Sequence, residues 1–316
     1  MVLTFDDNSL LPRLFGEHDQ NLARIESGFG VALTSRGNRL AISGSPWAAE
    51  AARGVLESLY RRLRGGAAEL SPGEVEAAIR LTLQGMDAGG GEEIRTPKRR
   101  IAPRSRVQAE YLAAMRDHEL VFGIGPAGTG KTYLAVARAV AMLAAGEVDR
   151  IILSRPAVEA GERLGFLPGD LRDKVDPYLR PLYDALHDMM PGDKVMRRLA
   201  DGDIEVAPLA FMRGRTLSSA FVILDEAQNA SPMQMKMFLT RLGEHSRMVV
   251  TGDLSQTDLP RGQPSGLADA IGILGDVPSV RVVTFTKADV ARHGLVTRIV
   301  EAYERREAEA RPDGGP

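Results

Sequence analysis

The chain has 316 residues, enough for two domains of ordinary size with a buried core in each. Apolar residues make up 44% of the chain and charged residues 26%, which excludes a disordered or fibrous protein. The net charge of -2 gives no overall sign of nucleic-acid or membrane binding, and the lack of cysteine excludes disulfides, thiolate metal sites and a cysteine nucleophile.

The amino terminus and the apolar runs predict a soluble, cytoplasmic protein with no membrane partner. Two acids, Asp6 and Asp7, stand where a secretory signal needs a basic start and a long apolar core. The longest uncharged apolar run, Ala139 to Ala145, is far shorter than the roughly 20 residues that span a bilayer.

Residues 1–85 are expected to form a small α+β domain. Apolar residues recur at helical spacing over 22–29, and Gly30 stands where a helix-ending glycine belongs. Apolar and polar residues then alternate over 31–42 around a polar turn, as they do in a hairpin. A second helix is predicted from Pro46, which follows a serine suited to cap it.

Residues 86–106 are expected to form an exposed linker, which is acidic and glycine-rich at first and then basic. A solvated hinge and a segment that contacts phosphates both fit this composition. The cations, with no acid among them, are Arg95, Lys98, Arg99, Arg100, Arg104 and Arg106.

Residues 107–305 are expected to form an α/β domain, and residues 306–316 a flexible tail. Short apolar runs alternate with longer helical stretches, and each run is continuous rather than alternating, as in strands that helices cover on both faces. A mainly parallel sheet is therefore predicted, with strands at 120–124, 151–153, 222–224, 248–251 and 280–285.

A glycine-rich segment matches the P-loop pattern G-x-x-x-x-G-K-[ST] between a predicted strand and a predicted helix. Glycines allow consecutive N–H groups to point at one anion, and Lys131 adds positive charge near the β- and γ-phosphates. A plain strand-to-helix turn would explain the glycines but not the Lys-Thr pair. The predicted nucleotide-binding residues are Gly125, Pro126, Ala127, Gly128, Thr129, Gly130, Lys131 and Thr132.

Two further strands end in polar residues. Asp225 and Glu226 follow the apolar run 221–224, as in a Walker B strand, although an acidic turn would look the same. Thr132 and Asp225 are predicted to hold magnesium, and Glu226 to orient and deprotonate the attacking water. Gln228 and Gln256 offer neutral amides for a phosphate oxygen or that water, although 252–256 also fits an Asx-type turn.

These residues are similar to known motifs. Asp225-Glu-Ala-Gln228 and Thr251-Gly-Asp-x-x-Gln256 resemble motifs II and III of superfamily 1 helicases, and Gln108 lies where such proteins read adenine. Segments 154–170, 177–184 and 208–217 look like the signatures of the PhoH family, cytoplasmic P-loop ATPases linked to phosphate starvation and RNA metabolism.

The resemblance covers about residues 95–305 and implies a RecA-like P-loop NTPase that uses ATP and Mg²⁺. It also implies that residues 1–85 are KH-like, although Gly16-Glu-His-Asp19 lacks the second glycine of the KH clamp on RNA. RNA and a ribonuclease are the partners implied by the family.

About thirty residues remain after the fifth predicted strand, too few for a second RecA-like domain. A cationic finger must then come from this domain or from a neighbouring subunit, which favours a homo-oligomer, by resemblance a hexameric ring. Arg213 and Arg292 are the first candidates and Arg215 the next, although each also fits a surface ion pair. The predicted catalytic residues are Lys131, Glu226, Gln256, Arg213 and Arg292.

Three functions fit this sequence. The first is an ATPase whose hydrolysis remodels RNA, as an RNA helicase does. The second is a nucleotide-gated RNA-binding switch with little turnover. The third is a P-loop kinase, but a kinase needs an Arg-rich lid and an acceptor pocket, and Asp-Glu-Ala-Gln favours water as the acceptor.

Overall fold

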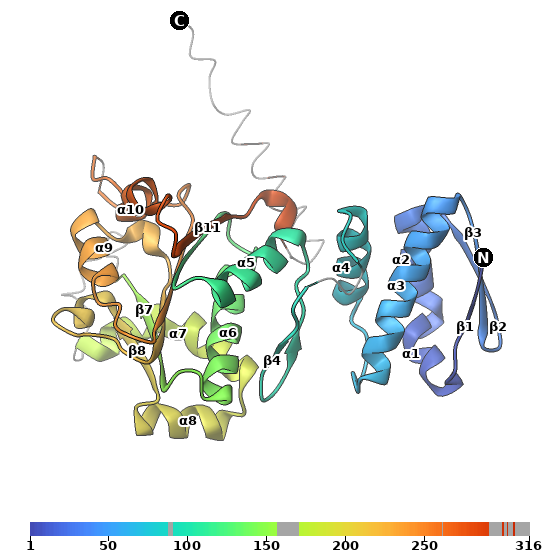
Figure 1. The fold of residues 1–316 in the computed structure, drawn as a ribbon, viewed down its shortest axis with the longest axis horizontal. Coiled ribbons are helices and arrows are strands. Elements are labelled where there is room, and N and C mark those ends of the chain that lie inside the picture. Colours follow the sequence, from blue (N-terminus) through green and yellow to red (C-terminus); the bar gives the residue numbers. More distant parts are fainter. Residues whose placement is uncertain are drawn as a thin grey trace, which may run out of the picture.

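The computed structural model describes residues 1–87, 91–156, 171–260 and 262–290, together with Ile299, Ala302 and Arg306. Figure 1 shows two lobes, the first formed by the amino-terminal elements and the second by a helix-covered sheet. Among the helices within these ranges, none has the length and apolar character that crossing a membrane requires.

The first lobe packs helices against one face of a small antiparallel sheet with strand order β1-β3-β2. It has a core of its own, which extends from Phe5 to Ile79. The long helix α3 begins after Ser45, whose hydroxyl accepts the Ala48 N–H at 3.2 Å. Its elements are β1 (Val2–Thr4), α1 (Leu11–Phe15), α2 (Gln20–Phe29), β2 (Ala32–Arg36), β3 (Arg39–Ser43), α3 (Pro46–Arg64) and α4 (Pro72–Leu83).

Part of the predicted linker is structured. Strands β4 (Ile94–Arg95) and β5 (Arg100–Ile101) pair as an antiparallel hairpin, in contrast to the expected exposed segment. Ile94 and Ile101 lie opposite each other and are buried in the core of the second lobe. The two isoleucines anchor the hairpin because their burial removes apolar surface from water, while the cations between them stay exposed.

The second lobe contains a parallel sheet of six strands, which confirms the predicted α/β class. The strand order is β11-β6-β10-β9-β7-β8, so β10 and β9 lie between β6 and β7. Edge strand β8 was not predicted, because its short, half-buried sequence shows no continuous apolar run. The strands are β6 (Leu120–Ile124), β7 (Arg150–Arg155), β8 (Ile204–Pro208), β9 (Ala220–Leu224), β10 (Arg247–Gly252) and β11 (Val280–Thr284).

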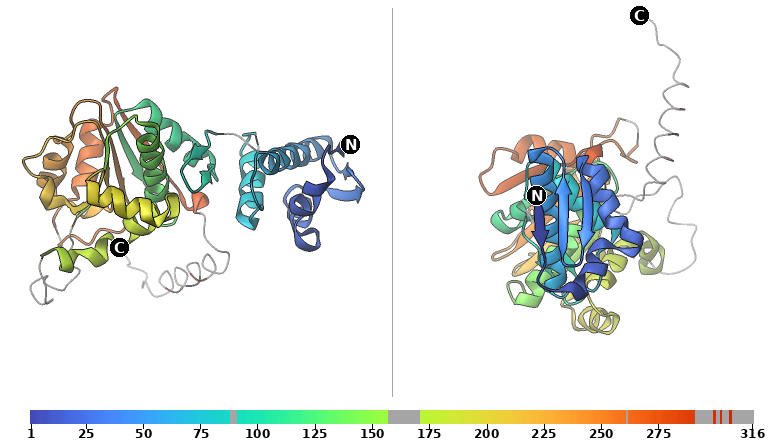
Figure 2. Two further views of the ribbon diagram at one scale, coloured as in Figure 1. Left: turned by 90° about the horizontal axis from the view of Figure 1, so that it is seen from below. Right: turned by 90° about the vertical axis from the view of Figure 1, so that its right-hand side faces the viewer.

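Helices cover both faces of this sheet (Figures 1 and 2). Helices α5, α6 and α7 share one core with one face, and α9 and α10 share a second core with the other. The helices of the lobe are α5 (Arg106–Asp117), α6 (Lys131–Ala145), α7 (Leu171–Met189), α8 (Gly192–Asp201), α9 (Pro232–Leu239) and α10 (Gly266–Leu274).

The strand order brings three sequence motifs to one edge of the sheet. Because the strands are parallel, the carboxyl ends of β6, β10, β9 and β7 lie side by side. The P-loop follows β6, the acidic pair follows β9, and the polar segment 253–256 follows β10. Ligands of open α/β sheets bind at this edge, so the RecA-like arrangement positions the candidate site.

Candidate nucleotide-binding site

The P-loop backbone is shaped by three glycines in left-handed or related conformations. Gly125, Gly128 and Gly130 have φ values of 143°, 83° and 84°, which other residues rarely adopt. A Cβ on Gly125 would lie 2.4 Å from the carbonyl oxygen of Phe285, so no side chain fits there. Helix α6 begins directly after Gly130, and its N-terminus adds the partial positive charge that favours an anion.

Lys131 folds back over this loop. Its ammonium nitrogen donates to the Gly125 carbonyl at 2.6 Å and to the Pro126 carbonyl at 2.8 Å, and the residue is only 8% exposed. The positive charge thus lies within the ring of backbone groups that cradles phosphates in a P-loop. This position suits the predicted contact of Lys131 with the β- and γ-phosphates.

Two hydroxyls converge on the carboxylate of Asp225. Thr132 Oγ1 donates to Asp225 Oδ1 at 2.6 Å, and Thr251 Oγ1 donates to the same oxygen at 2.7 Å. Asp225 is held at the end of β9 by a bond from its N–H to the Ser154 carbonyl, and it is buried. These hard oxygen donors, few in number, suit Mg²⁺, which takes its other ligands from phosphates and water.

Within the described ranges, no three His, Asp or Glu side chains gather as a group that could hold a metal ion. A magnesium ion at Thr132 and Asp225 would therefore depend on the nucleotide for further ligands.

Glu226 has a strained backbone, and each oxygen of its carboxylate has one partner within the protein. Its φ of 52° is left-handed, which costs a residue with a side chain about 1–3 kcal/mol and is found mainly at functional sites. Oε1 pairs with Arg155 Nη2 at 3.0 Å, and Oε2 accepts from Gln228 Nε2 at 2.6 Å.

Gln228 connects Glu226 to the end of β10. Its side-chain oxygen accepts the Asp253 N–H at 3.0 Å, and it is 1% exposed. The Asp253 carboxylate in turn accepts from the Gln256 amide at 2.9 Å and from the Ser255 N–H at 3.0 Å. The segment after β10 thus forms an Asx-type turn, and the Gln256 side chain is held beside it.

Gln108 lies against the P-loop but makes two bonds within the protein. Its side-chain oxygen accepts the Arg104 N–H at 2.7 Å, and its amide nitrogen donates to the Thr129 carbonyl at 2.9 Å. The residue is buried. Gln108 therefore braces the P-loop against the start of α5, and the reading of adenine by its remaining N–H stays a prediction.

The candidate arginine fingers lie apart from the P-loop. Arg215 forms a two-bond ion pair with Glu205 of β8, with both N···O distances at 2.6 Å, which is the structural alternative to a finger. Arg213 is exposed just beyond β8. Strand β8 is four strand spacings from β6, or ~19 Å. Arg292 lies outside the described residues.

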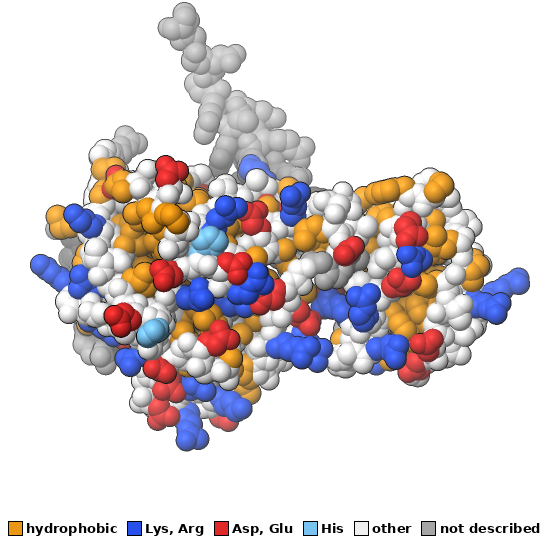
Figure 3. Space-filling view, viewed as in Figure 1, with side chains coloured by type: hydrophobic (Ala, Val, Ile, Leu, Met, Phe, Trp, Pro, Cys, Tyr) orange, Lys and Arg blue, Asp and Glu red, His pale blue; other side chains and the backbone are white. Residues whose placement is uncertain are grey.

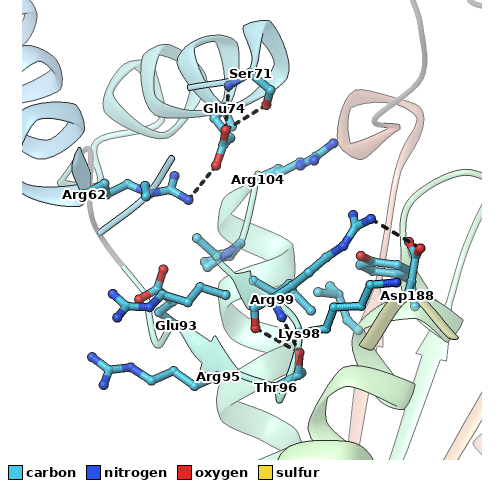
Figure 4. A pocket seen from close by; sticks show the side chains of 18 of the residues that line it. Arg62, Ser71, Glu74, Glu93, Arg95, Thr96, Lys98, Arg99, Arg104 and Asp188 are labelled. Carbon is cyan, nitrogen blue, oxygen red and sulfur yellow. Dashed lines mark hydrogen bonds and ion pairs between the residues drawn. The ribbon is translucent and has the colours of Figure 1, made fainter. Parts of the chain in front are cut away.

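A cationic cleft of about 1140 Å³ lies between the two lobes, next to the P-loop residues Gly128 and Gly130. Figure 4 shows side chains from α3, α4 and the β4–β5 hairpin around it, and Figure 3 shows Lys and Arg side chains near the junction of the lobes. Its acidic residues are Glu74, Glu93 and Asp188, and its basic residues are Arg61, Arg62, Arg95, Lys98, Arg99, Arg100 and Arg104.

Two of these cations are paired within the cleft wall. Arg62 pairs with Glu74 at 2.8 Å, and Arg99 lies 3.4 Å from Asp188. Tyr133 of α6 lies beside Arg99 and Asp188, and burial raises the pKa of its hydroxyl. The phenol therefore stays neutral in the physiological range, and Tyr133 lies next to these cations in the wall of the cleft.

Sequence reasoning missed two residues of the site. Thr251 was named only as part of a motif. The signal that could have identified it is its position near the carboxyl end of the buried strand β10. Arg155 ends β7 as a cation after a buried strand, the same signal that identified Asp225. Arg155 contacts Glu226 and Thr251 contacts Asp225, and in each pair the two residues lie far apart in the sequence.

The fold and these residues define a P-loop nucleotide-binding protein of the RecA-like class. A family model described as PhoH-like protein matches residues 100–304. The chain belongs to the PhoH family. It is 50% identical over 298 residues to the PhoH-like protein of Bacillus subtilis, a match that covers 92% of this chain and 93% of that relative.

Two other relatives agree with this membership. The chain is 47% identical over 313 residues to a PhoH-like protein of Synechocystis, covering 96% of this chain and 94% of the relative. It is 48% identical over 206 residues to the protein PhoH of Escherichia coli, covering 64% of this chain and 58% of the relative.

Proposed function

We propose that this protein hydrolyses ATP with the help of magnesium and that RNA binding in the cationic cleft is coupled to hydrolysis. The convergence of Thr132 and Thr251 on Asp225, with Glu226 as the next residue, carries the first part of the proposal. This arrangement supports hydrolysis, because oxygen ligands for magnesium and a carboxylate base lie next to the P-loop at one edge of the sheet.

Each group has a distinct task in this proposal. Lys131 and the loop N–H groups hold the β- and γ-phosphates, and Glu226 orients the attacking water and takes its proton. Thr132 and Asp225 hold magnesium, which when bound would neutralise charge on the phosphates. Gln256, whose amide donates to Asp253, would sense the loss of the γ-phosphate.

Two substitutions separate nucleotide binding from hydrolysis. Lys131→Ala should weaken ATP binding, because the positive charge at the phosphates is lost. Glu226→Gln should preserve binding and lower phosphate release at least 100-fold, because an amide cannot take the proton of the water. Fluorescent-nucleotide titration and phosphate release measure the two effects.

The matched control for Glu226→Gln is Glu244→Gln, which changes an exposed acid in the turn before β10. It should leave both quantities unchanged. Equal loss of ATP binding in the Lys131 and Glu226 variants would contradict the separate roles.

The balance of charge in the cleft supports RNA as its ligand. Seven basic and three acidic side chains line it, and Tyr133 adds an aromatic residue to the same lining. The Arg104 N–H bonds to Gln108, and Gln108 bonds to Thr129 of the P-loop. A strand bound at Arg104 would therefore be only two hydrogen bonds from the nucleotide.

Replacing four exposed cleft cations tests this part of the proposal. Arg95, Lys98, Arg100 and Arg104 changed together to Gln should weaken binding of poly(U) and lower its salt slope by about 3, because each lost phosphate contact removes about 0.7 from the slope. Fluorescence anisotropy at several salt concentrations measures both.

The control replaces two exposed cations of the β2–β3 hairpin, Arg36→Gln and Arg39→Gln. It should leave the slope unchanged. If the salt slope is also unchanged in the variant with the four cleft substitutions, these cleft cations form a solvated surface and do not contact RNA.

One observation favours the second candidate, a nucleotide-gated RNA-binding switch with little turnover. The Arg155 guanidinium and the Gln228 amide each bind one carboxylate oxygen of Glu226, so two donors of the protein compete with water for this base. Phosphate release that rises with added RNA would favour the ATPase. Slow release that RNA does not change, together with ATP-dependent RNA affinity, would favour the switch.

A further inference from the structure

The carboxyl end of strand β7 supports both acidic residues that follow β9. The two strands are parallel neighbours, with Ser154 opposite Leu224. The Ser154 carbonyl accepts the Asp225 N–H at 2.9 Å. The next residue, Arg155, pairs through Nη2 with Oε1 of Glu226 at 3.0 Å. Two consecutive residues of β7 thus hold two consecutive residues of the proposed catalytic segment.

Arg155 holds Glu226 from a rigid part of the fold. It is the last residue of β7, and the buried Pro156 that follows it favours an extended backbone at Arg155. The Arg155 side chain is 21% exposed, so the protein covers most of it. A planar guanidinium also loses little conformational freedom for each hydrogen bond that it forms. Arg155 therefore gives Glu226 a partner at a fixed position.

Glu226 needs this support because its side chain is long and 38% exposed. The bond from Gln228 to Oε2, at 2.6 Å, would by itself let the carboxylate turn about that contact. The second bond, from Arg155 to Oε1, fixes the plane of the carboxylate. Each oxygen keeps room for the attacking water, since an ionised carboxylate accepts about four hydrogen bonds and these two partners use only two.

The position of Arg155 in the sheet favours an indirect role. Arg155 ends β7, three strand spacings or ~14 Å from the P-loop strand β6. This separation favours contact with the base, Glu226, over contact with the γ-phosphate.

We propose that Arg155 is a positioning residue that holds the Glu226 carboxylate in the orientation that takes a proton from the attacking water. The proton passes to a free lone pair of Glu226. The water oxygen bonds to the γ-phosphorus, and the bond from that phosphorus to the oxygen bridging the β- and γ-phosphates breaks. This inference rests on the proposed ATPase function.

The test compares substitutions of Arg155 in the full chain. Arg155→Met keeps the alkyl stem but removes the charge, and Arg155→Lys keeps a charge without the planar fork. Arg198→Met is the matched control, because Arg198 forms an ion pair with Asp203, also at 3.0 Å, at the amino end of the sheet. Thermal unfolding of each variant checks that it folds.

Arg155→Met should lower kcat for ATP roughly 10- to 100-fold, because a small misplacement of a reacting group costs about this much in rate. Its affinity for ATP should equal that of the wild type, because Arg155 does not hold the phosphates. The kcat of Arg155→Lys should lie between the two, and Arg198→Met should match the wild type. Phosphate release and fluorescent-nucleotide titration measure the two quantities.

Free guanidinium gives a readout that a purely structural role would not change. In Arg155→Ala, guanidinium chloride well below unfolding concentrations should restore part of kcat, because the ion can bind Oε1 of Glu226 in place of the missing side chain. Sodium chloride at the same concentration should restore nothing. In Arg155→Ala combined with Glu226→Gln, guanidinium should also have no effect.

Several results would overturn the proposal. A wild-type kcat in Arg155→Met would make the ion pair irrelevant to hydrolysis, and weaker ATP binding would place Arg155 on the nucleotide. A loss of kcat that guanidinium does not restore, or restores without Glu226, would make Arg155 structural. A wild type that binds ATP but releases no phosphate would instead contradict the proposed hydrolysis, and the role of Arg155 would fall with it.

Discussion

Tyr111 of α5 is fully buried beneath the P-loop strand, and its hydroxyl has no hydrogen-bond partner among the residues that the structure describes. A Cβ on Gly123 of β6 would lie 2.8 Å from this hydroxyl, so the glycine makes room for it. Burial raises the pKa of the Tyr111 hydroxyl, and the negative charge of Asp225 adds to the increase. A buried hydroxyl without a partner is a cost to the folded state.

Tyr111→Phe should therefore raise the free energy of unfolding by about 1 kcal/mol at pH 7. Because the pKa of Tyr111 is raised in the folded state, the unfolded chain loses this proton first, near an unfolded pKa of about 10. The wild type therefore loses stability as the pH rises above that value, whereas phenylalanine has no proton to lose. The advantage of the variant should thus grow above pH 10. Urea unfolding at pH 7 and at pH 10.5 measures both effects.

Tyr60→Phe is the matched control, because the Tyr60 hydroxyl accepts the Asp7 N–H at 2.8 Å. It should lower stability by about 1 kcal/mol. A lower stability for Tyr111→Phe as well would show that the Tyr111 hydroxyl has a partner.

At the scale of elements, one acidic side chain fastens the segment before β4 to two helices. Glu92 binds Arg138 of α6 at 2.6 Å and Arg116 of α5 at 3.1 Å. Arg138 is 8% exposed and also donates to the Leu112 carbonyl. The bond from Arg138, together with the charges of both arginines, lowers the pKa of Glu92.

Glu92→Gln should lower the free energy of unfolding by about 2 kcal/mol, since the buried Arg138 loses its counter-charge. Because the folded pKa is lowered, the contribution of Glu92 is present above an unfolded pKa of about 4.3 and is lost as the pH falls through the folded value. Wild type and variant should therefore converge toward pH 3 in urea unfolding.

The control is Glu110→Gln, which breaks an exposed pair with Arg281 and should cost less than 1 kcal/mol. Equal losses in the two variants at pH 7 would contradict a special role for the buried arginine.

At the scale of the whole molecule, the part of the chain that the structure describes contains one RecA-like sheet. In the proposed ATPase, such a domain by itself would leave the γ-phosphate open on one side. Arg215 is already paired, and the exposed Arg213 lies near the edge strand β8, far from the P-loop of its own chain. We therefore propose that Arg213 reaches the site of a neighbouring copy in a homo-oligomer, as the single domain led us to expect.

Mixing wild type with Arg213→Ala should lower ATPase activity by more than the fraction of variant, because each variant subunit disables the site of its neighbour. In trans-acting ATPases such a finger contributes roughly 10³ to 10⁵ in rate. Phosphate release across mixing ratios, with light scattering for the mass, measures this. A fully active monomer would rule out a finger in trans.

Local sequence determined the nucleotide-binding elements. Glycine, Lys and Thr at fixed spacing are enough to form a P-loop between a strand and a helix, because each residue acts through its own backbone or nearest turn. Continuous apolar runs likewise identified five of the six strands of the large sheet. The predicted Walker B acid, Asp225, was likewise identified from the apolar run before it, which forms strand β9.

The tertiary structure alone decided which side chains meet across the sheet edge. Arg155 pairs with Glu226, and Thr251 joins Thr132 on Asp225, because β10 and β9 lie between β6 and β7. Arg61 and Asp188, 127 positions apart in the chain, likewise line one cleft. Sequence patterns report the period and composition of one element, whereas these contacts depend on strand order and on the packing of two lobes, which no single segment encodes.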